Sequence, residues 1–226
     1  MSETKPESMT SQAYDKIRSE IILCRLKPND KLIIADLCDT FKVSLGAVRE
    51  ALSRLTSEGL VISIPRKGFR VADLSQEELI DLTDTRIKIE LMCIENSIAN
   101  GDLKWESGIV SALFELSKTP IEDAVNSKYI SPDWTSAHKR FHESLVAACD
   151  SKCLLTIREN LYSQSERYRQ ASVPLDVKER DIIGEHSKIA DAALEHNVKK
   201  TQDELERHLH KTTSILIKAY AENGMF

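Results

Sequence analysis

The segment VSLGAVREALSRLTSEGLVISIPRKGFRV, residues 43–71, decides the fold of this chain. Its first half predicts a helix, because apolar residues recur at the i, i+4 and i+7 positions of one face: Val48, Leu52 and Leu55. Ser44 can accept a hydrogen bond from the first free N–H groups of that helix. Gly59 suits the position just beyond its end. One face of the helix is therefore expected to be buried in a hydrophobic core.

The second half of the segment predicts a short basic β-hairpin. Residues 60–64 alternate as a β-branched strand, and residues 69–71 supply the return strand. The turn between them holds two adjacent cations, Arg66 and Lys67, followed by Gly68. A hairpin tip that carries two cations suits a phosphate or the wall of a nucleic-acid groove.

The residues upstream complete a winged helix-turn-helix. Residues 14–23 have isoleucines at helical spacing and predict a first helix, and residues 27–30 predict a turn. Residues 34–41 supply a second helix, which residues 42–44 link to the third. The third helix is expected to be the recognition helix, because its outer face carries small and basic residues that can approach a phosphate backbone.

The sequence therefore predicts double-stranded DNA as a partner. The residues expected to contact it are Ser44, Leu45, Gly46, Arg49, Arg54, Arg66, Lys67 and Gly68. Residues 1–71 hold 12 Lys and Arg against 9 Asp and Glu, a net charge of +3, whereas the remainder holds 19 against 27, a net charge of −8. Because phosphate contacts contribute much of DNA affinity, so small an excess predicts a homodimer acting on an inverted repeat.

Composition bounds the rest of the chain. The 226 residues, 41% of them hydrophobic, are enough for two modest domains, and helical patterns dominate after residue 75. We expect a mainly α protein with a disordered tail at 1–9, the winged helix-turn-helix at 10–72 and an all-helical bundle at 75–222. No signal-peptide pattern or membrane-length apolar run occurs, which predicts a cytoplasmic protein without a membrane partner. The five cysteines are expected to be reduced thiols.

All six histidines lie beyond residue 137. His138 and His142 are four residues apart in a helical pattern, so both imidazoles project from one face at a spacing that a metal ion can bridge. His186 and His208 lie in two further helical segments. Three such helices in a bundle can bring four nitrogen ligands to one centre. The alternative is that the pair is a partly exposed polar face without a metal.

The N-terminal pattern resembles the DNA-binding domain of the GntR superfamily of bacterial transcription regulators. The matching residues span 10–72 and include Tyr14, Arg18, Pro28, Leu37, Val43, Ser44, Val48, Arg49, Glu50, Ala51, Leu52, Gly59, Leu60, Gly68 and Phe69. Two positions depart from the family pattern. Cys24 replaces a usual glycine after the first helix, and Leu45 replaces a usual basic residue after the cap serine, so the operator cannot be inferred from other members.

Residues 79–216 are similar to the all-helical FCD effector domain of the FadR subfamily. The resemblance rests on TRIKIE, HKRFHESL, residues 154–169, GEH at 184–186 and ERHL at 206–209. It implies that His138, His142, His186 and His208 hold a divalent metal, zinc first, with nickel and manganese as alternatives. The first ligand of metal-binding members is commonly an aspartate, which is His138 here. Imidazole remains a competent ligand for zinc or nickel.

The resemblance also implies a small organic acid effector held beside the metal. Arg86 is the expected cationic partner, with Arg167 and Tyr162 as further candidates, because a guanidinium and a metal can hold a carboxylate at two points. The alternative for Arg86 is an ion pair with Glu90 within one helix.

The sequence as a whole predicts an effector-responsive transcription regulator, expected to be a repressor. A metal-dependent enzyme fused to a DNA-binding head is the competing class, since such a metal can activate water. The sequence lacks a nucleophile elbow, a phosphate loop and an HExxH motif, so we expect no enzyme. The third hypothesis is that the metal has only a structural role and stiffens the helical bundle.

Overall fold

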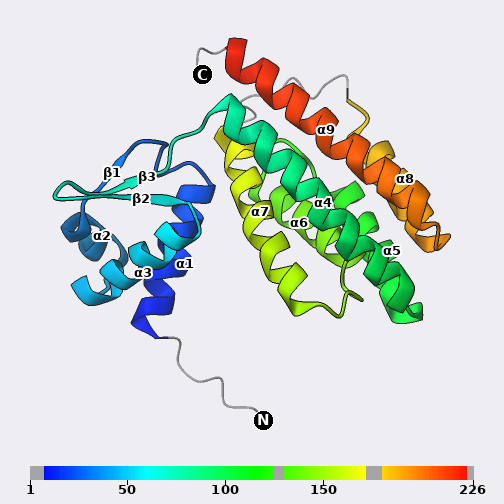
Figure 1. Cartoon of the computed structure of the whole chain (residues 1–226), viewed down its shortest axis with the longest axis horizontal. Helices are drawn as coiled ribbons and strands as arrows, with labels where there is room; N and C mark the ends of the chain where they lie inside the picture. Colours follow the sequence, from blue (N-terminus) through cyan, green and yellow to red (C-terminus); the bar gives the residue numbers. More distant parts are fainter. Residues whose placement is uncertain (1–7, 125–129, 172–179, 223–226) are drawn as a thin grey trace. The chain divides into compact units, whose positions relative to one another are not determined.

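The computed structural model describes residues 8–124, 130–171 and 180–222. The chain divides into two compact units, one holding the residues up to Ser75 together with 163–171, and one holding the remainder. We call them the N-terminal unit and the helical unit, and Figure 1 labels the elements of both. The tail expected at residues 1–9 lies almost wholly outside the described residues.

The N-terminal unit packs three helices against a small antiparallel sheet. The helices are α1 (Met9–Ile22), α2 (Ile34–Phe41) and α3 (Leu45–Ser57), and the strands are β1 (Lys31–Leu32), β2 (Val61–Ile64) and β3 (Gly68–Val71). The sheet order is β1-β3-β2, so the hairpin strand β3 lies in the centre. This arrangement confirms the predicted winged helix-turn-helix. Strand β1 was missed, because two residues carry no readable alternation.

Local chemistry explains where α3 begins and ends. The Ser44 hydroxyl accepts a hydrogen bond from the Ala47 N–H at 3.3 Å. Gly59 follows the helix with a φ of 74°, a conformation in which a side chain would be strained. Val48, Leu52 and Leu55 are fully buried in the core of the unit, as their spacing predicted. Cys24, at the usual glycine position, adopts a φ of 52°.

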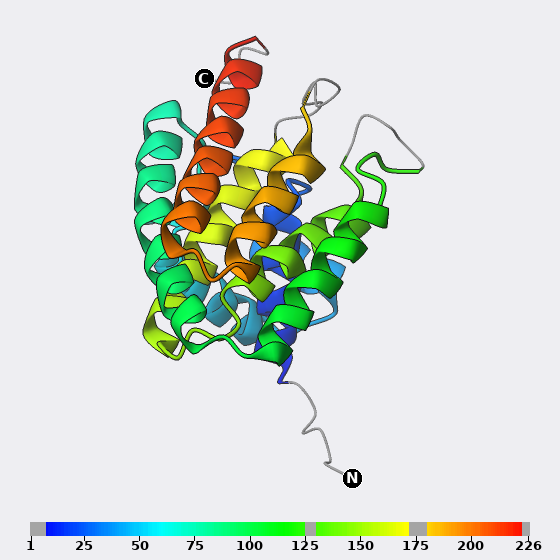
Figure 2. The same cartoon turned by 90° about the vertical axis from the view of Figure 1, so that its right-hand side faces the viewer.

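The helical unit is built from six helices. They are α4 (Gln76–Asn100), α5 (Leu103–Lys118), α6 (Pro132–Leu145), α7 (Lys152–Ala171), α8 (Ile182–Leu194) and α9 (Val198–Glu222), of which α7 contributes only its residues up to 162. Helix α9 lies between α4 and α8, and α5 packs against α6 and α8 (Figure 2). The predicted all-helical bundle is therefore confirmed.

Side-chain caps fix the starts of three of these helices. Asp102, Ser131 and Asp181 accept hydrogen bonds from N–H groups of the first turns of α5, α6 and α8. The α8 cap also explains Gly184, because a Cβ there would lie 2.0 Å from a carboxylate oxygen of Asp181. These caps hold α6 and α8 in the register that places their histidines.

Among the described residues, no helix combines the length and the apolar character needed to cross a membrane.

Candidate functional site

Four histidine side chains meet inside the helical unit. His138 and His142 lie one turn apart on α6, His186 lies on α8 and His208 on α9. Each is at most 5% exposed, and one ring nitrogen from each lies within 4.8 Å of the others. The structure thus brings together all four residues that the sequence singled out as ligands. Spacing alone predicted only the pair on α6.

Hydrogen bonds orient two of the rings toward the common centre. The His186 Nδ1 lies 2.7 Å from the carbonyl oxygen of Ile182, and the His208 Nδ1 lies 3.0 Å from the Glu185 carboxylate. Carbonyl and carboxylate oxygens only accept, so both Nδ1 atoms carry the proton, and the lone pair lies on Nε2. Metal-binding histidines have this arrangement, with the second nitrogen donating to an oxygen.

The two rings on α6 approach each other closely. The Nε2 atoms of His138 and His142 are 3.2 Å apart, and the His138 Nδ1 lies 3.4 Å from the Tyr162 hydroxyl. Trp134 stacks on the His138 ring with centroids 4.7 Å apart. Burial lowers the pKa of His142 well below its usual value, and the neighbouring histidines His186 and His208 and the guanidinium groups of Arg86 and Arg158 lower that pKa further. The neutral imidazole that a metal requires is therefore the stable form.

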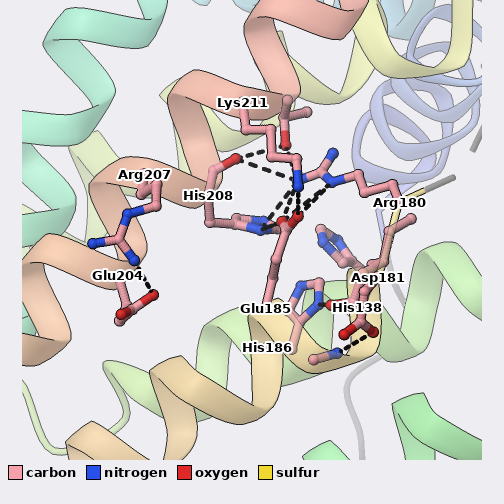
Figure 3. A network of polar contacts seen from close by, with 12 residues as sticks. His138, Arg180, Asp181, Glu185, His186, Glu204, Arg207, His208 and Lys211 are labelled. Atoms are coloured by element: carbon pink, nitrogen blue, oxygen red, sulfur yellow. Dashed lines mark hydrogen bonds and ion pairs between the residues drawn. The ribbon is translucent and has the colours of Figure 1, made fainter.

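A charged network supports His208 (Figure 3). Glu185 accepts hydrogen bonds from His208, from Arg180 at 2.6 Å and from Lys211 at 2.6 Å. Burial alone would raise the pKa of Glu185, but these three hydrogen bonds together hold it below its usual range. Arg180 also lies 3.3 Å from the His208 Nδ1. The closer carboxylate decides the proton position, since Glu185 can only accept there.

Sequence reasoning missed this supporting network. The sequence analysis gave no role to Arg180 or Lys211. A signal was present only for Lys211, which lies three residues after His208 and therefore on the same face of α9.

The proposed effector residue Arg86 belongs to a second buried network. Its Nε donates to the Glu90 carboxylate at 3.3 Å, and Arg158 donates to the same carboxylate at 2.7 Å. All three side chains are at most 4% exposed. Arg158 also donates to the His142 carbonyl oxygen at 2.9 Å, and the Arg86 guanidinium lies 4.9 Å from the centre of the Tyr162 ring. Arg86 and Tyr162 thus lie next to the histidine cluster, and the Arg86–Glu90 ion pair is also present.

Arg167, the other effector candidate, lies in the part of α7 that belongs to the N-terminal unit. Its guanidinium donates to the Ala72 carbonyl oxygen at 2.6 Å. The structure therefore places Arg167 and the histidine cluster in different units, and it gives Arg167 a hydrogen-bonding role within its own.

The residues expected to contact DNA lie on the surface of the N-terminal unit. All eight are exposed: Ser44, Leu45, Gly46, Arg49, Arg54, Arg66, Lys67 and Gly68. The first five lie on or next to the first turns and outer face of α3, and the last three form the tip of the β2–β3 hairpin. Arg66 adopts a φ of 63° in that tight turn.

Arg54 differs from the other predicted DNA contacts. Its guanidinium lies 3.7 Å from the centre of the Tyr14 ring and 3.6 Å from the Glu58 carboxylate. Tyr14 in turn donates to Glu58 at 2.8 Å. Burial and the Glu58 hydrogen bond raise the pKa of Tyr14 to about 12, so its hydroxyl stays protonated. Arg54 therefore has an intramolecular role besides its expected role at DNA.

The histidine cluster fits a divalent metal on its chemistry. Four buried imidazoles provide a nitrogen donor set of the kind that zinc, nickel and copper prefer over manganese. The outer nitrogens of His186 and His208 are hydrogen-bonded to oxygens, which fixes the donor atoms toward the centre. Among the described residues, no cysteine or carboxylate joins the group.

Comparison with known proteins agrees with both units. The family model of bacterial regulatory proteins of the gntR family matches residues 9–71, and the FCD domain model matches residues 81–211. The regulator BphR of Paraburkholderia xenovorans is 32% identical, covering 92% of this chain and 85% of BphR. The repressor GlaR of Escherichia coli is 31% identical, covering 93% of this chain and 96% of GlaR.

Solved structures share the same fold. Escherichia coli McbR/YncC has a TM-score of 0.78 at 20% identity, covering 95% of this chain and 99% of that one. A GntR regulator from Rhodococcus has a TM-score of 0.75 at 21% identity, covering 95% of this chain and all of that one. The relatives BphR and GlaR are transcription regulators, which leaves the enzyme class without support. A winged helix-turn-helix followed by a helical FCD domain, matched along both units, shows that this chain belongs to the GntR family of DNA-binding transcription regulators.

Proposed function

We propose that this regulator is an effector-responsive repressor that binds an inverted-repeat operator as a homodimer. A divalent metal, held by His138, His142, His186 and His208, takes part in binding a small organic acid. The four convergent, buried imidazole nitrogens carry this proposal. The relative GlaR is named as a transcriptional repressor, which supports repression rather than activation.

Zinc is the expected metal. Four neutral imidazoles suit zinc or nickel, whereas manganese prefers oxygen donors. His138 takes the place of the commoner aspartate, so the donor set has one more nitrogen and one less negative charge. When bound, the metal supplies a Lewis acid that can hold an effector carboxylate. The chain's own residues orient the imidazoles and exclude water from the centre.

Arg86 and Tyr162 support the effector half of the proposal. Arg86 lies against the Tyr162 ring, and the Tyr162 hydroxyl lies 3.4 Å from His138, so a cation and a hydroxyl group adjoin the histidines. A carboxylate bound there would compete with Glu90 for the Arg86 guanidinium. Binding would thereby change the packing of α4, the helix that begins directly after the N-terminal unit.

The test uses an operator selected by the protein from random-sequence duplexes. Zinc-loaded protein is titrated with small mono- and dicarboxylates while operator binding is followed by fluorescence anisotropy. We expect one class of acid to release the DNA, and we expect Arg86→Met to lose that response while retaining DNA binding. Unchanged DNA affinity with every acid would leave the metal a structural role, and hydrolysis of an added substrate would support an enzyme.

An exposed apolar face on α5 supports the homodimer. Leu103, Val110 and Phe114 are 79%, 54% and 64% exposed at spacings of seven and four residues, so they share one face. The opposite face buries Trp105 and Ile109 in the core. A helix that is apolar on both sides is normally covered on both. Helix α5 carries two Lys and two Glu, so its second face can meet a second copy without net charge repulsion.

Phe114→Glu should therefore convert the dimer into a monomer. The substitution puts a carboxylate into the interface twice, once from each copy, and central aromatic residues contribute about 2 kcal/mol or more each. Sedimentation equilibrium should show the dissociation constant rise by at least about 100-fold. Ile80→Glu, at an exposed apolar residue of α4, is the matched control and should remain dimeric. A Phe114→Glu dimer of unchanged strength would remove α5 from the interface.

A further inference from the structure

A polar segment of α7 is buried in this protein. Residues 163–169 read SQSERYR and lie in the N-terminal unit, although the FCD domain model spans them. All of them except Gln164, which is half-buried, are at most 9% exposed. Burying polar side chains costs free energy unless they form hydrogen bonds. The partners of these side chains therefore indicate what the segment does.

Gln164 contacts the end of the recognition helix α3. Its side-chain amide donates to the carbonyl oxygen of Glu58, the C-cap residue, at 3.2 Å. The carbonyl oxygens of Arg54, Leu55 and Thr56 accept from the backbone N–H groups that directly follow α3. Gln164 adds a further donor, from 106 residues along the chain, at the negative end of the helix dipole. This hydrogen bond fixes the end of α3 that lies away from its N-cap.

The same segment holds the parts of the N-terminal unit that precede and follow α3. Arg167 donates to the carbonyl oxygen of Ala72, directly after β3, at 2.6 Å, and its own carbonyl oxygen accepts from the Cys24 thiol at 3.5 Å. Burial raises the pKa of Cys24 to about 11, so the thiol keeps the proton that it donates. Arg18 of α1 donates to the Ser163 hydroxyl. Cys24, which departs from the usual glycine of the family, thus has a partner in this segment.

We propose that residues 163–168 form a clamp that positions the recognition helix, with Gln164 and Arg167 as positioning residues for DNA recognition. Apolar contacts hold one face of α3 in the core, whereas the hydrogen bonds of the clamp fix its end and the chain that leaves β3. Base edges are read through short, directed hydrogen bonds, so base recognition needs an accurately placed helix. Phosphate contacts carry no sequence information and come from long, adaptable side chains. The clamp should therefore contribute to specificity rather than to overall DNA affinity.

The ratio of two DNA affinities tests the role of Gln164. Full-length protein is titrated against an operator selected from random-sequence duplexes and against a mixed-sequence duplex of the same length. Gln164→Met keeps the length of the side chain but removes the donor, and the operator-to-mixed ratio should fall at least about fivefold, roughly the value of one base contact. Affinity for the mixed duplex should change less than about twofold, with an unchanged salt dependence, because no phosphate contact is lost.

Gln202→Met is the matched control. Gln202 also donates from its side-chain amide to a backbone carbonyl oxygen, that of Leu91 at 3.4 Å, but it lies in the helical unit. This variant should keep the wild-type ratio. Arg167→Met should lower the ratio as Gln164→Met does, whereas Arg167→Lys, which retains a cationic donor, should keep it.

Three outcomes would overturn the clamp as a determinant of specificity. The first is a wild-type ratio in Gln164→Met. The second is an equal loss of affinity for both duplexes in that variant, because a merely structural role lowers the amount of competent protein and leaves the ratio unchanged. The third is a fall of the ratio in Gln202→Met as large as that in Gln164→Met.

Discussion

Zinc should raise the melting temperature of the helical unit by roughly 8–16 °C. A ligand present at about 1,000 times its dissociation constant stabilises the folded state by about 4 kcal/mol, and each kcal/mol shifts the midpoint by about 2–4 °C in a chain of this size. Both tryptophans, Trp105 and Trp134, lie in this unit, so their fluorescence reports its unfolding alone. Trp134 also stacks on His138, which makes its emission a direct probe of zinc binding.

Removing one imidazole should abolish this effect. His186→Ala deletes a fully buried donor, and we expect zinc affinity, measured by competition with a chromophoric chelator, to fall by more than about 100-fold. His210→Ala is the matched control, because His210 lies on α9 only two residues from His208 but is half exposed. It should keep both the affinity and the temperature shift.

Glu185→Gln should lower zinc affinity, but by less than His186→Ala does. Glutamine can still accept the hydrogen bond from His208, but it loses the negative charge that Arg180 and Lys211 hold in place. Substitutions of such supporting residues lower metal affinity by about 10- to 100-fold. If zinc still raises the melting temperature of His186→Ala, His186 is not a ligand. If zinc does not raise the melting temperature of the wild-type protein, there is no metal centre at this site.

The fold was predictable because its signals are local. Apolar spacing, Ser44 and Gly59 located α3 to within a residue, and they act through hydrogen bonds and backbone angles inside one short segment. Strand β1 was not predictable, since it is defined by the pairing of Lys31 and Leu32 with β3, which lies about 40 residues later.

In the candidate metal site, too, the local features were predictable from the sequence and the features that depend on helix packing were not. The spacing of His138 and His142 on one helix face followed from the sequence, whereas the approach of His186 and His208 depends on how α6, α8 and α9 pack. Family resemblance supplied that information. Neither spacing nor resemblance indicated the bridging of Arg86 and Arg158 by Glu90, because the two arginines come from helices about 70 residues apart.

Glu90→Gln should destabilise the helical unit by about 3–5 kcal/mol. The Glu90 carboxylate is 1% exposed and accepts from Arg158 at 2.7 Å and from Arg86 at 3.3 Å. Its neutral replacement has nearly the same shape but removes the negative charge that both guanidinium groups contact, and breaking a buried pair in this way costs about that much. A typical domain has only about 5–15 kcal/mol of stability in total.

Urea unfolding followed by tryptophan fluorescence measures this change in the helical unit itself. Glu95→Gln is the matched control, because Glu95 lies on α4 as well but is exposed, and its substitution should change the free energy of unfolding by less than about 0.5 kcal/mol. Arg158→Met should cost less than Glu90→Gln, since Glu90 keeps Arg86 and only one charge is lost. A Glu90→Gln protein as stable as the control would show that the Glu90 carboxylate is not needed to compensate the two buried arginines.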